Sequence, residues 1–455
     1  MSRLFGTDGV RGVANADLQP ELAFALGRAA AAAFSRTVAP EHPVVVGRDT
    51  RLSGSMLEAA IVAGITSTGR NVVQVGVVPT PAVAAITRLI EAAAGVMISA
   101  SHNPIEDNGI KFFGGDGFKL SDTAEDAIEA LLHDPAIARP THHDVGVATS
   151  ARGLVDRYFA QLVTAGADLT GMTIVVDAAY GAAYDVGPRI LRKLGADVIA
   201  INAADDGARI NMNCGATNLA MLQATVKATA AERGGPVVGV AFDGDADRAL
   251  FVDETGAILS GDHIMLVVGR ELKSRAALVG NVVVGTVMSN VGLERALARE
   301  GIRLLRAPVG DRYVLEMMRE GGYVFGGEQS GHIIDLALNT TGDGPMSAVA
   351  LFSIVARSGR SLHELAASLT VYPQILLNVR VNRKDVLATD PHIAAAIFAA
   401  ETELGSEGRI LVRPSGTEPL IRVMIEGGDS QTIQTLAERV AASIREVAGV
   451  APVGT

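Results

Sequence analysis

The chain has 455 residues, more than one ordinary hydrophobic core accommodates, so we expect several domains. Hydrophobic residues make up 48% and charged residues 20%, which is the balance of a globular protein and excludes a disordered one. The net charge of −11 excludes broad electrostatic attraction to nucleic acid or to an anionic membrane, so we expect neither as a partner.

The start of the chain and its apolar segments point away from secretion and membranes. Met1-Ser2-Arg3 leads directly into a glycine-rich motif, which leaves no room for a signal peptide. The longest apolar runs, such as Pro236–Phe242, have the length of strands and are too short to span a bilayer. Cys214 is the single cysteine, so an internal disulfide is excluded, and we expect a packed thiol in a cytoplasmic protein.

Short β-branched runs alternate with Ala/Leu-rich helical stretches over most of the chain. The predicted strands are Val44–Val46, Asn71–Val77, Gly95–Ser99, Thr173–Asp177, Asp197–Ile201, Val237–Phe242, Asn281–Val287 and Arg303–Arg306. Helices are predicted after Ser53, up to Leu194, and over Thr217–Arg233, Val291–Glu300 and Asp311–Arg319. Apolar strands separated by amphipathic helices indicate three α/β blocks with mixed, mainly parallel sheets.

The tail of the chain follows a different pattern. Strands are predicted at Ile375–Val381, Arg409–Val412 and Leu420–Glu426, and helices at Pro391–Leu404 and Thr432–Val447. Two strands joined by a tight Pro/Gly segment indicate a smaller α+β domain. We therefore expect four domains, over residues 1–150, 151–253, 254–370 and 371–455.

A loop that contains Ser101 follows the strand Gly95–Ser99. It reads Ser101-His102-Asn103-Pro104 and continues to Asn108-Gly109-Ile110-Lys111. Sheets of α/β proteins bind ligands at the carboxyl ends of their strands, so Ser101 is a candidate nucleophile with His102 and Lys111 close by in sequence. A turn with local Ser and Asn hydrogen bonds explains the loop equally well. The pattern differs from the G-x-S-x-G elbow of hydrolases, which disfavours acyl transfer.

Three aspartates at alternate positions follow the strand Val237–Phe242. In Asp243-Gly244-Asp245-Ala246-Asp247-Arg248, the carboxylates can converge on one hard cation if the loop curls round it. An EF-hand is disfavoured, because its sixth position requires glycine and Arg248 stands there. We predict a divalent metal site, with Mg²⁺ favoured; a solvated acidic turn is the alternative.

Two later loops carry polar groups that suit a phosphorylated sugar. Arg413-Pro414-Ser415-Gly416-Thr417, with Arg422 beyond it, offers guanidinium groups, hydroxyls and a glycine backbone, which suit a phosphate dianion better than a plain hairpin turn does. Gly327-Glu328-Gln329-Ser330-Gly331-His332 suits sugar hydroxyls, which donate and accept hydrogen bonds. A polar loop with a helix cap explains this second loop as well.

Arginines also occur in two loops near the start of the chain. The opening motif Phe5–Gly12 contains Arg11, which could reach a reacting phosphate. In the related loop Gly47–Gly54, the grouping of Arg48, Asp49 and Arg51 favours a structural ion-pair network over a contact with substrate.

These motifs occur in the order and spacing of the α-D-phosphohexomutase family, and the resemblance covers essentially the whole chain. It implies four domains round a central cleft and transfer of a phosphoryl group between sugar hydroxyls. Within the family, the sequence is most similar to bacterial members that interconvert glucosamine 6-phosphate and glucosamine 1-phosphate. This similarity is carried by the segments Phe5–Gly12, Ser99–Phe113 and Glu328-Gln329-Ser330. That reaction passes through a 1,6-bisphosphate and feeds UDP-N-acetylglucosamine synthesis for the cell wall.

The resemblance implies a role for each motif. Ser101 would be a phosphoserine required for activity, and Asp243, Asp245 and Asp247 would bind one Mg²⁺ together with a phosphoserine oxygen. His102 and Lys111 would handle protons, and Arg11 and Arg248 would stabilise the transferred charge. The substrate-binding residues would be Glu328, Ser330, His332, Arg413, Ser415, Gly416, Thr417 and Arg422.

Three other activities remain open at this point. The same chemistry could act on glucose or mannose phosphates, the site could be a metal-dependent phosphatase, or the protein could bind a sugar phosphate without turnover. A homodimer is common among similar enzymes. Pro345 replaces an apolar residue more usual in the family, and we expect it to be tolerated in the first turn of a helix.

Overall fold

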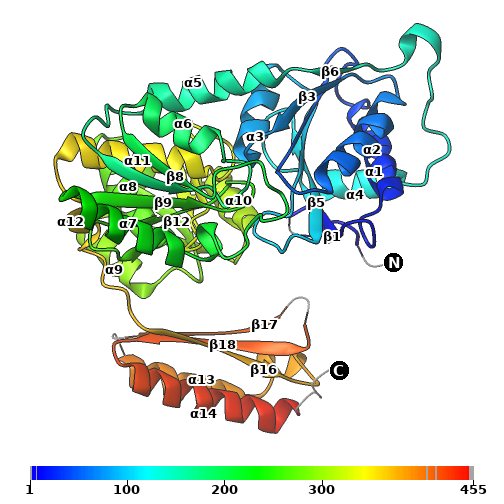
Figure 1. Cartoon of the computed structure of the whole chain (residues 1–455). Coiled ribbons are helices and arrows are strands. Elements are labelled where there is room, and N and C mark those ends of the chain that lie inside the picture. Colours follow the sequence, from blue (N-terminus) through cyan, green and yellow to red (C-terminus); the bar gives the residue numbers. More distant parts are fainter. Residues whose placement is uncertain (1–2, 7, 406–407, 416–417, 450–455) are drawn as a thin grey trace. The chain divides into compact units, whose positions relative to one another are not determined.

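The computed structural model describes residues 3–6, 8–405, 408–415 and 418–449. The chain divides into two compact units. The first unit comprises Met1–Thr286 and Leu305–Ala367, and the second comprises Val287–Leu304 and Ser368–Thr455. Figure 1 labels the elements of both units. No helix in the described part of the chain has the length and apolar character needed to cross a membrane.

The first block of the first unit is a six-stranded sheet with the order β1-β5-β4-β2-β3-β6. Its strands are β1 (Val10–Val13), β2 (Val44–Arg48), β3 (Val72–Val77), β4 (Ala94–Ile98), β5 (Asp107–Gly114) and β6 (Ala148–Ser150). β2 is parallel to β3 and β4, whereas β5 is antiparallel to β4 and β1. The sequence patterns do not predict this antiparallel edge, which places Arg11 opposite Gly109.

Helices cover both faces of this sheet. α1 (Pro20–Phe34), α2 (Gly54–Thr66) and α4 (Asp122–Leu131) share a core with one face, and α3 (Thr80–Leu89) packs on the other (Figure 1). Two glycines let α1 and α2 approach closely. A Cβ atom at Gly27 or Gly64 would overlap a backbone carbonyl of the other helix. The valine-rich strand β2 is buried on both sides, as expected of a parallel strand in an α/β protein.

The second block is a five-stranded sheet with the order β11-β10-β9-β7-β8. Its elements are β7 (Thr173–Asp177), β8 (Asp197–Ile201), β9 (Val237–Phe242), β10 (Ala249–Val252), β11 (Ile258–Leu259), α5 (Val155–Ala165), α6 (Val186–Lys193) and α7 (Ala220–Arg233). The chain beyond the expected boundary at residue 253 continues into this sheet, since β11 pairs with β10. Asp253 Oδ1 accepts hydrogen bonds from the backbone of Thr255 and Ala257, and this turn folds the chain back into the sheet.

The third block has the strand order β13-β12-β14-β15. Its elements are β12 (Val282–Thr286), β13 (Arg303–Ala307), β14 (Phe325–Gly327), β15 (Ile333–Asp335), α8 (Gly261–Ser274), α10 (Asp311–Gly321), α11 (Gly344–Ser358) and α12 (Leu362–Ala366), and α9 (Val291–Arg299) follows β12 along the chain. Pro345 lies in the first turn of α11, as predicted, and Asp343 caps that helix by accepting from the backbone of Met346 at 2.8 Å.

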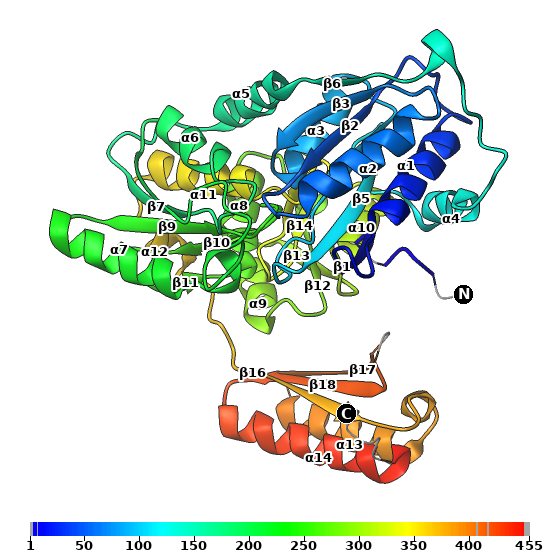
Figure 2. The same cartoon turned by 45° about the vertical axis from the view of Figure 1, so that its right-hand side comes forward.

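The second unit contains a three-stranded antiparallel sheet with the order β16-β18-β17. Its elements are β16 (Gln374–Arg380), β17 (Gly408–Pro414), β18 (Leu420–Gly427), α13 (Pro391–Leu404) and α14 (Ser430–Ala448). Both helices pack on one face of the sheet (Figure 2). The predicted elements of the tail agree with these bounds to within about two residues. The expected mixed α/β blocks and smaller α+β domain are confirmed.

Candidate active site

Ser101 lies in the loop that follows β4 and is 1% exposed. Its Oγ donates a hydrogen bond to Oδ2 of Asp243 at 2.6 Å, so the hydroxyl faces the second block. The backbone at Ser101 is left-handed, with a φ of +52°, which strains a residue other than glycine. The loop therefore holds a strained backbone at the residue whose hydroxyl contacts the aspartates.

The three aspartates lie in the tight turn between β9 and β10. Asp243, Asp245 and Asp247 are all buried, and one oxygen of each lies within 4.8 Å of the others. Ala246 has a left-handed φ of +56°, which curls the turn. Among the described residues, Oδ1 of Asp245 and Oδ1 of Asp247 have no hydrogen-bond partner. Buried carboxylate oxygens are costly without a partner, so this turn fits a divalent cation.

The charges of the turn act on one another. Burial, and then the charges of Asp247 and Asp245, raises the pKa of Asp243 to about 8. Burial acts in the same direction on the pKa of Asp247, but the charges of His332 and Lys111 outweigh it and lower that pKa overall. A cation between the carboxylates would relieve the repulsion that Asp243 experiences.

Lys111 projects from β5 into this acidic turn. Its Nζ lies 2.9 Å from Oδ2 of Asp245 and 3.0 Å from Oδ2 of Asp8. Burial lowers the pKa of Lys111, but the carboxylates of Asp245 and Asp8 outweigh it and raise the pKa overall. Lys111 is therefore held as a cation beside the turn.

Three charged residues near the aspartate turn are not singled out by the sequence patterns, namely Asp8, Lys119 and Asp311. Lys119 Nζ lies 2.6 Å from Oδ1 of Asp8 and 2.5 Å from Oδ2 of Asp311, so it joins the first and third blocks. Asp8 belongs to the opening motif, but its partners are brought to it by the pairing of β1 with β5. The available signal for Asp8 was an acidic residue in a glycine-containing motif, Gly6-Thr7-Asp8-Gly9, and no pattern marks Lys119.

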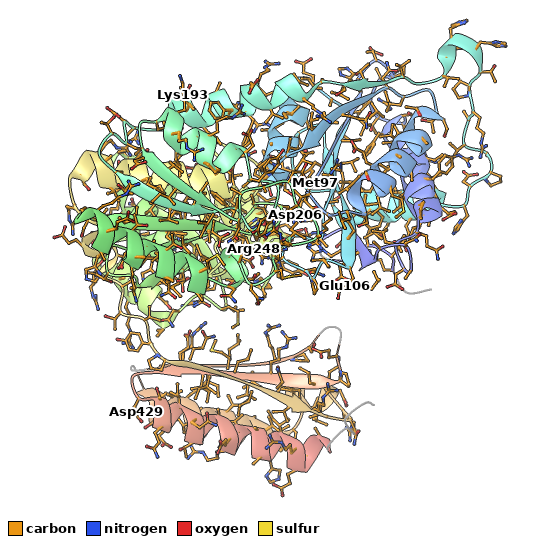
Figure 3. The ribbon with its side chains drawn as sticks, viewed as in Figure 1. Met97, Glu106, Lys193, Asp206, Arg248 and Asp429 are labelled. Atoms are coloured by element: carbon orange, nitrogen blue, oxygen red, sulfur yellow. The ribbon has the colours of Figure 1, made fainter. Side chains whose placement is uncertain are left out.

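Arg248, His102 and Arg11 gather beside Ser101. Nη1 of Arg248 lies 3.0 Å from Nδ1 of His102, and Nδ1 of His102 in turn lies 3.4 Å from Oγ of Ser101. Burial, and then the charges of Arg248 and Arg11, lowers the pKa of His102 to about 4. Arg11 donates to Oδ1 of Asn103 at 3.2 Å. Figure 3 labels Arg248, together with Met97 of β4, the strand that leads into the Ser101 loop.

The loop between β14 and β15 contains the three residues predicted to contact the sugar, and it exposes them to different degrees. Ser330 is exposed, and its Oγ lies 3.4 Å from Oε2 of Glu328, which also accepts from the backbone of Gly310 at 3.2 Å through Oε1. His332, predicted to contact the sugar, is instead 1% exposed. Its Nδ1 lies 3.5 Å from Oδ2 of Asp247, because a β-bridge pairs His332 with Arg248.

The second unit carries the arginine loop. Arg413 of β17 and Arg422 of β18 are directly opposite each other, an unfavourable arrangement of like charges, and Nη2 of Arg422 also lies 3.3 Å from Oε2 of Glu418. Burial, and then the charge of Arg422, lowers the pKa of Arg413. The hydroxyl of Ser415 accepts from the backbone of Glu418 at 3.2 Å. The predicted contacts Gly416 and Thr417 lie outside the described residues.

Lys384 is a further cation at this loop that the sequence patterns do not single out. Its Nζ donates to the backbone oxygen of Ser415 at 2.7 Å and to that of Glu418 at 3.1 Å. These two hydrogen bonds connect Ser415 with Glu418, and they lie beside two arginines whose like charges repel each other. Lys384 therefore adds a third cationic side chain beside Ser415, next to Arg413 and Arg422, and this grouping suits a dianion.

Known proteins resemble the chain over its whole length. A phosphoglucosamine mutase of Symbiobacterium thermophilum is 53% identical over 448 residues, which cover 98% of this chain and 99% of the relative. A phosphoglucosamine mutase of Mycolicibacterium smegmatis is 49% identical over 456 residues, covering 98% and 99%.

Solved structures share the fold. A phosphoglucomutase/phosphomannomutase family protein of Burkholderia thailandensis matches with a TM-score of 0.84 at 23% identity, covering 99% of each chain. An Aspergillus fumigatus N-acetylphosphoglucosamine mutase, in complex with GlcNAc-6P and magnesium, matches with a TM-score of 0.67 at 18% identity, covering 98% of this chain and 96% of the other.

Models of the four domains of one family match successive parts of the chain. They describe α/β/α domain I over residues 2–136, domain II over 156–256, domain III over 260–372 and the C-terminal domain over 376–443. The turn with the three aspartates lies within the match to domain II, and the Ser101 loop within that to domain I. With every block of the fold accounted for in this way, the chain belongs to the phosphoglucomutase/phosphomannomutase family.

Proposed function

We propose that this chain is an isomerase that interconverts glucosamine 6-phosphate and glucosamine 1-phosphate through a phosphorylated Ser101. The observation that carries the choice of amino sugar is the identity of about half of all residues with phosphoglucosamine mutases over essentially their full length. The mechanism is supported by a buried serine hydroxyl 2.6 Å from an aspartate of a candidate metal turn.

The reaction conserves atoms and charge across two transfers. In the first, the bond between Ser101 Oγ and phosphorus breaks, a bond from phosphorus to O1 of the sugar forms, and the O1 proton is passed on so that Ser101 regains its hydroxyl. The resulting 1,6-bisphosphate reorients within the site, so that its O6 phosphate faces Ser101. In the second transfer, the bond between O6 and phosphorus breaks, a bond from phosphorus to Ser101 Oγ forms, and the Ser101 proton passes to O6, which leaves glucosamine 1-phosphate.

Residues of the first unit would stabilise the charge that moves. Phosphoryl transfer depends on alignment and neutralisation of charge more than on covalent chemistry. Arg248 and Arg11 lie beside Ser101 and would contact the moving group, and Lys111 is a fixed cation at the aspartate turn. Glu328 and Ser330, on the exposed part of their loop, would accept and donate hydrogen bonds to sugar hydroxyls. Nδ1 of His102 lies 3.4 Å from Oγ of Ser101, and a neutral imidazole carries both a donor and an acceptor nitrogen, which suits proton transfer.

The arginine loop of the second unit would hold the phosphate that is not reacting. Arg413 and Arg422 oppose each other, and a dianion between them would turn this repulsion into attraction. Ser415, Gly416 and Thr417 would add hydroxyl and backbone donors.

The aspartate turn would hold one Mg²⁺ ion. Its two carboxylate oxygens without a hydrogen-bond partner in the described chain support this proposal, and Mg²⁺ prefers carboxylates combined with phosphate. When bound, the ion supplies positive charge beside the phosphoryl oxygens. Isothermal titration calorimetry with Mg²⁺ tests the site without reference to activity. Asp247→Asn should weaken binding at least about tenfold, whereas the exposed Asp168→Asn should leave it unchanged.

A substrate panel tests the activity. The purified protein is incubated with glucosamine, glucose and mannose 6-phosphates, with Mg²⁺ and with EDTA, and the 1-phosphates and inorganic phosphate are measured. We expect isomerisation of the amino sugar to be fastest and to require Mg²⁺. Equal rates on all three sugars would contradict the choice of glucosamine, and release of inorganic phosphate without isomer would indicate a phosphatase. We place the reaction in the cytoplasm and propose a homodimer, which light scattering of the purified protein tests.

A further inference from the structure

The backbone of Ser101 is held at both of its polar groups. Its N–H donates to Oγ of Ser99 at 2.9 Å, and Oγ of Ser99 donates in turn to Oδ2 of Asp49 at 2.6 Å. Its carbonyl oxygen accepts from Nη2 of Arg51 at 2.9 Å and from Nδ2 of Asn211 at 2.8 Å. A strained, left-handed residue persists only where its surroundings fix it, and these contacts do so.

Arg51 organises the loop from within the first block. The side chain is fully buried, and its guanidinium group pairs with Asp49 at 3.1 Å, whereas Arg48, expected in the same ion-pair network, pairs with Glu58 at 3.0 Å. Its remaining N–H groups donate to four backbone carbonyls of the Ser101 loop. The acceptors are Ser101, Asn103, Pro104 and Asp107.

Asn211 reaches the same carbonyl from the second block. It lies in the loop between β8 and α7, and its backbone N–H donates to Ala179 at 3.0 Å. Asp206 of the same loop is labelled in Figure 3. The amide of Asn211 also lies 3.4 Å from the carbonyl oxygen of Asn103. Asn211 thus donates from the block that carries the aspartates to the backbone of the Ser101 loop.

The backbone of the aspartate turn approaches the same carbonyl closely. A Cβ atom at Gly244, which lies between Asp243 and Asp245, would be 2.5 Å from the carbonyl oxygen of Ser101 and 2.9 Å from Nδ2 of Asn211. Only glycine fits there. The carbonyl of Ser101 is therefore enclosed by Arg51, Asn211 and the backbone of the aspartate turn.

We propose that Asn211 is a positioning residue, which holds the carbonyl of Ser101 and thereby fixes where its Oγ points relative to the aspartates. The inference rests on the proposed role of Ser101 as the phosphoryl carrier. Rotation of the peptide bond after Ser101 would turn its Cβ and displace Oγ. Displacements of about 1 Å cost transfer reactions up to about 100-fold in rate.

The same loop offers a matched control. Asn213 lies two residues beyond Asn211, and both have a left-handed backbone, with φ of +53° and +59°. Replacement by alanine therefore costs the backbone a similar strain at each position. The side chain of Asn213 is exposed, and in the described part of the structure it makes no hydrogen bond.

The test compares Asn211→Ala with Asn213→Ala in the full-length enzyme. We expect Asn211→Ala to lower kcat by about 10- to 100-fold with the KM for glucosamine 6-phosphate unchanged, because only the carrier is misplaced. Single-turnover transfer from phospho-Ser101 to the sugar should slow equally. Asn213→Ala should stay within about twofold of the parent, and the two variants should have similar Tm values. Asn211→Asp, which has the same shape but no N–H donor, should behave like Asn211→Ala.

Three outcomes would overturn the role of Asn211. The first is an equal kcat in the two alanine variants, and the second is full activity in Asn211→Asp. The third is a loss of kcat in Asn211→Ala that is explained by a lower Tm. Ser101→Ala, measured in parallel, separates this inference from the proposed function. Turnover in Ser101→Ala would refute the carrier itself, whereas an inactive Ser101→Ala with a fully active Asn211→Ala would refute only the positioning.

Discussion

Tyr158→Phe removes one hydroxyl from a buried contact between the second and third blocks. Tyr158 of α5 is 1% exposed, and its hydroxyl donates to Oδ1 of Asp343 at 2.8 Å. Asp343 also accepts from Asn339 at 2.9 Å and caps α11 through Met346. Burial raises the pKa of Asp343 to about 6, and the donors from Asn339, Met346 and Tyr158 counteract this effect.

The size of the effect depends on the charge of Asp343. Above pH 6 the carboxylate is ionised, and a hydrogen bond to a charged group is worth about 1.5–3 kcal/mol. Below pH 6 the group is protonated in the folded state, and a neutral hydrogen bond is worth about 1 kcal/mol. Because the pKa of Asp343 is raised on folding, the folded state is destabilised as pH rises from about 4 through 6, and loss of the Tyr158 donor enlarges that penalty.

Calorimetric unfolding at pH 5 and pH 8 tests this reasoning. A loss of about 2 kcal/mol at pH 8 lowers the Tm of a unit of this size by roughly 3 °C, and the shift at pH 5 should be about half as large. Tyr313→Phe is the control, since Tyr313 is 38% exposed. An unchanged Tm, or the same shift at both pH values, would refute the role assigned to the charged hydrogen bond.

Two other predictions concern the thiol and the helix packing. Burial, and then the charge of Asp177, raises the pKa of Cys214 to about 12, so alkylation by iodoacetamide at pH 8 should be at least about 100-fold slower in the folded protein than in urea; fast alkylation of the folded protein would contradict this. Gly64→Ala should destabilise the first unit by about 1–3 kcal/mol in urea unfolding, despite the better helix propensity of alanine, because the added methyl group overlaps the carbonyl of Phe24. Gly235→Ala, where a Cβ meets nothing within 4 Å, should be neutral, and equal stability of the two variants would refute the packing argument.

Local patterns were enough to predict eight of the strands of the α/β blocks, among them β2, β4 and β9, and the loops that follow them. The spacing of Asp243, Asp245 and Asp247 is a local feature, and so is the position of Ser101 after an apolar strand. The pattern of the tail likewise predicts its elements, because each contrasts in periodicity with the loops beside it.

Contacts that depend on the pairing of distant segments could not be predicted. Lys111 contacts Asp8 because β5 pairs with β1. No local sequence pattern predicts this antiparallel pairing. Asn211 meets Ser101 across 110 positions of sequence. The contact of His332 with Asp247 likewise depends on a β-bridge between His332 and Arg248, which are far apart in sequence.

Following the phosphoryl group of Ser101 tests the central claim most directly. Protein carrying a ³²P-labelled phosphoryl group at Ser101 is mixed with unlabelled glucosamine 6-phosphate, and the label is followed in protein and sugar phosphates. We predict that label leaves Ser101 and appears in glucosamine 1,6-bisphosphate and the monophosphates, at a rate no slower than turnover, and that Ser101→Ala takes up no label and has no activity. Turnover while the label stays on the protein, or an active Ser101→Ala, would contradict the account.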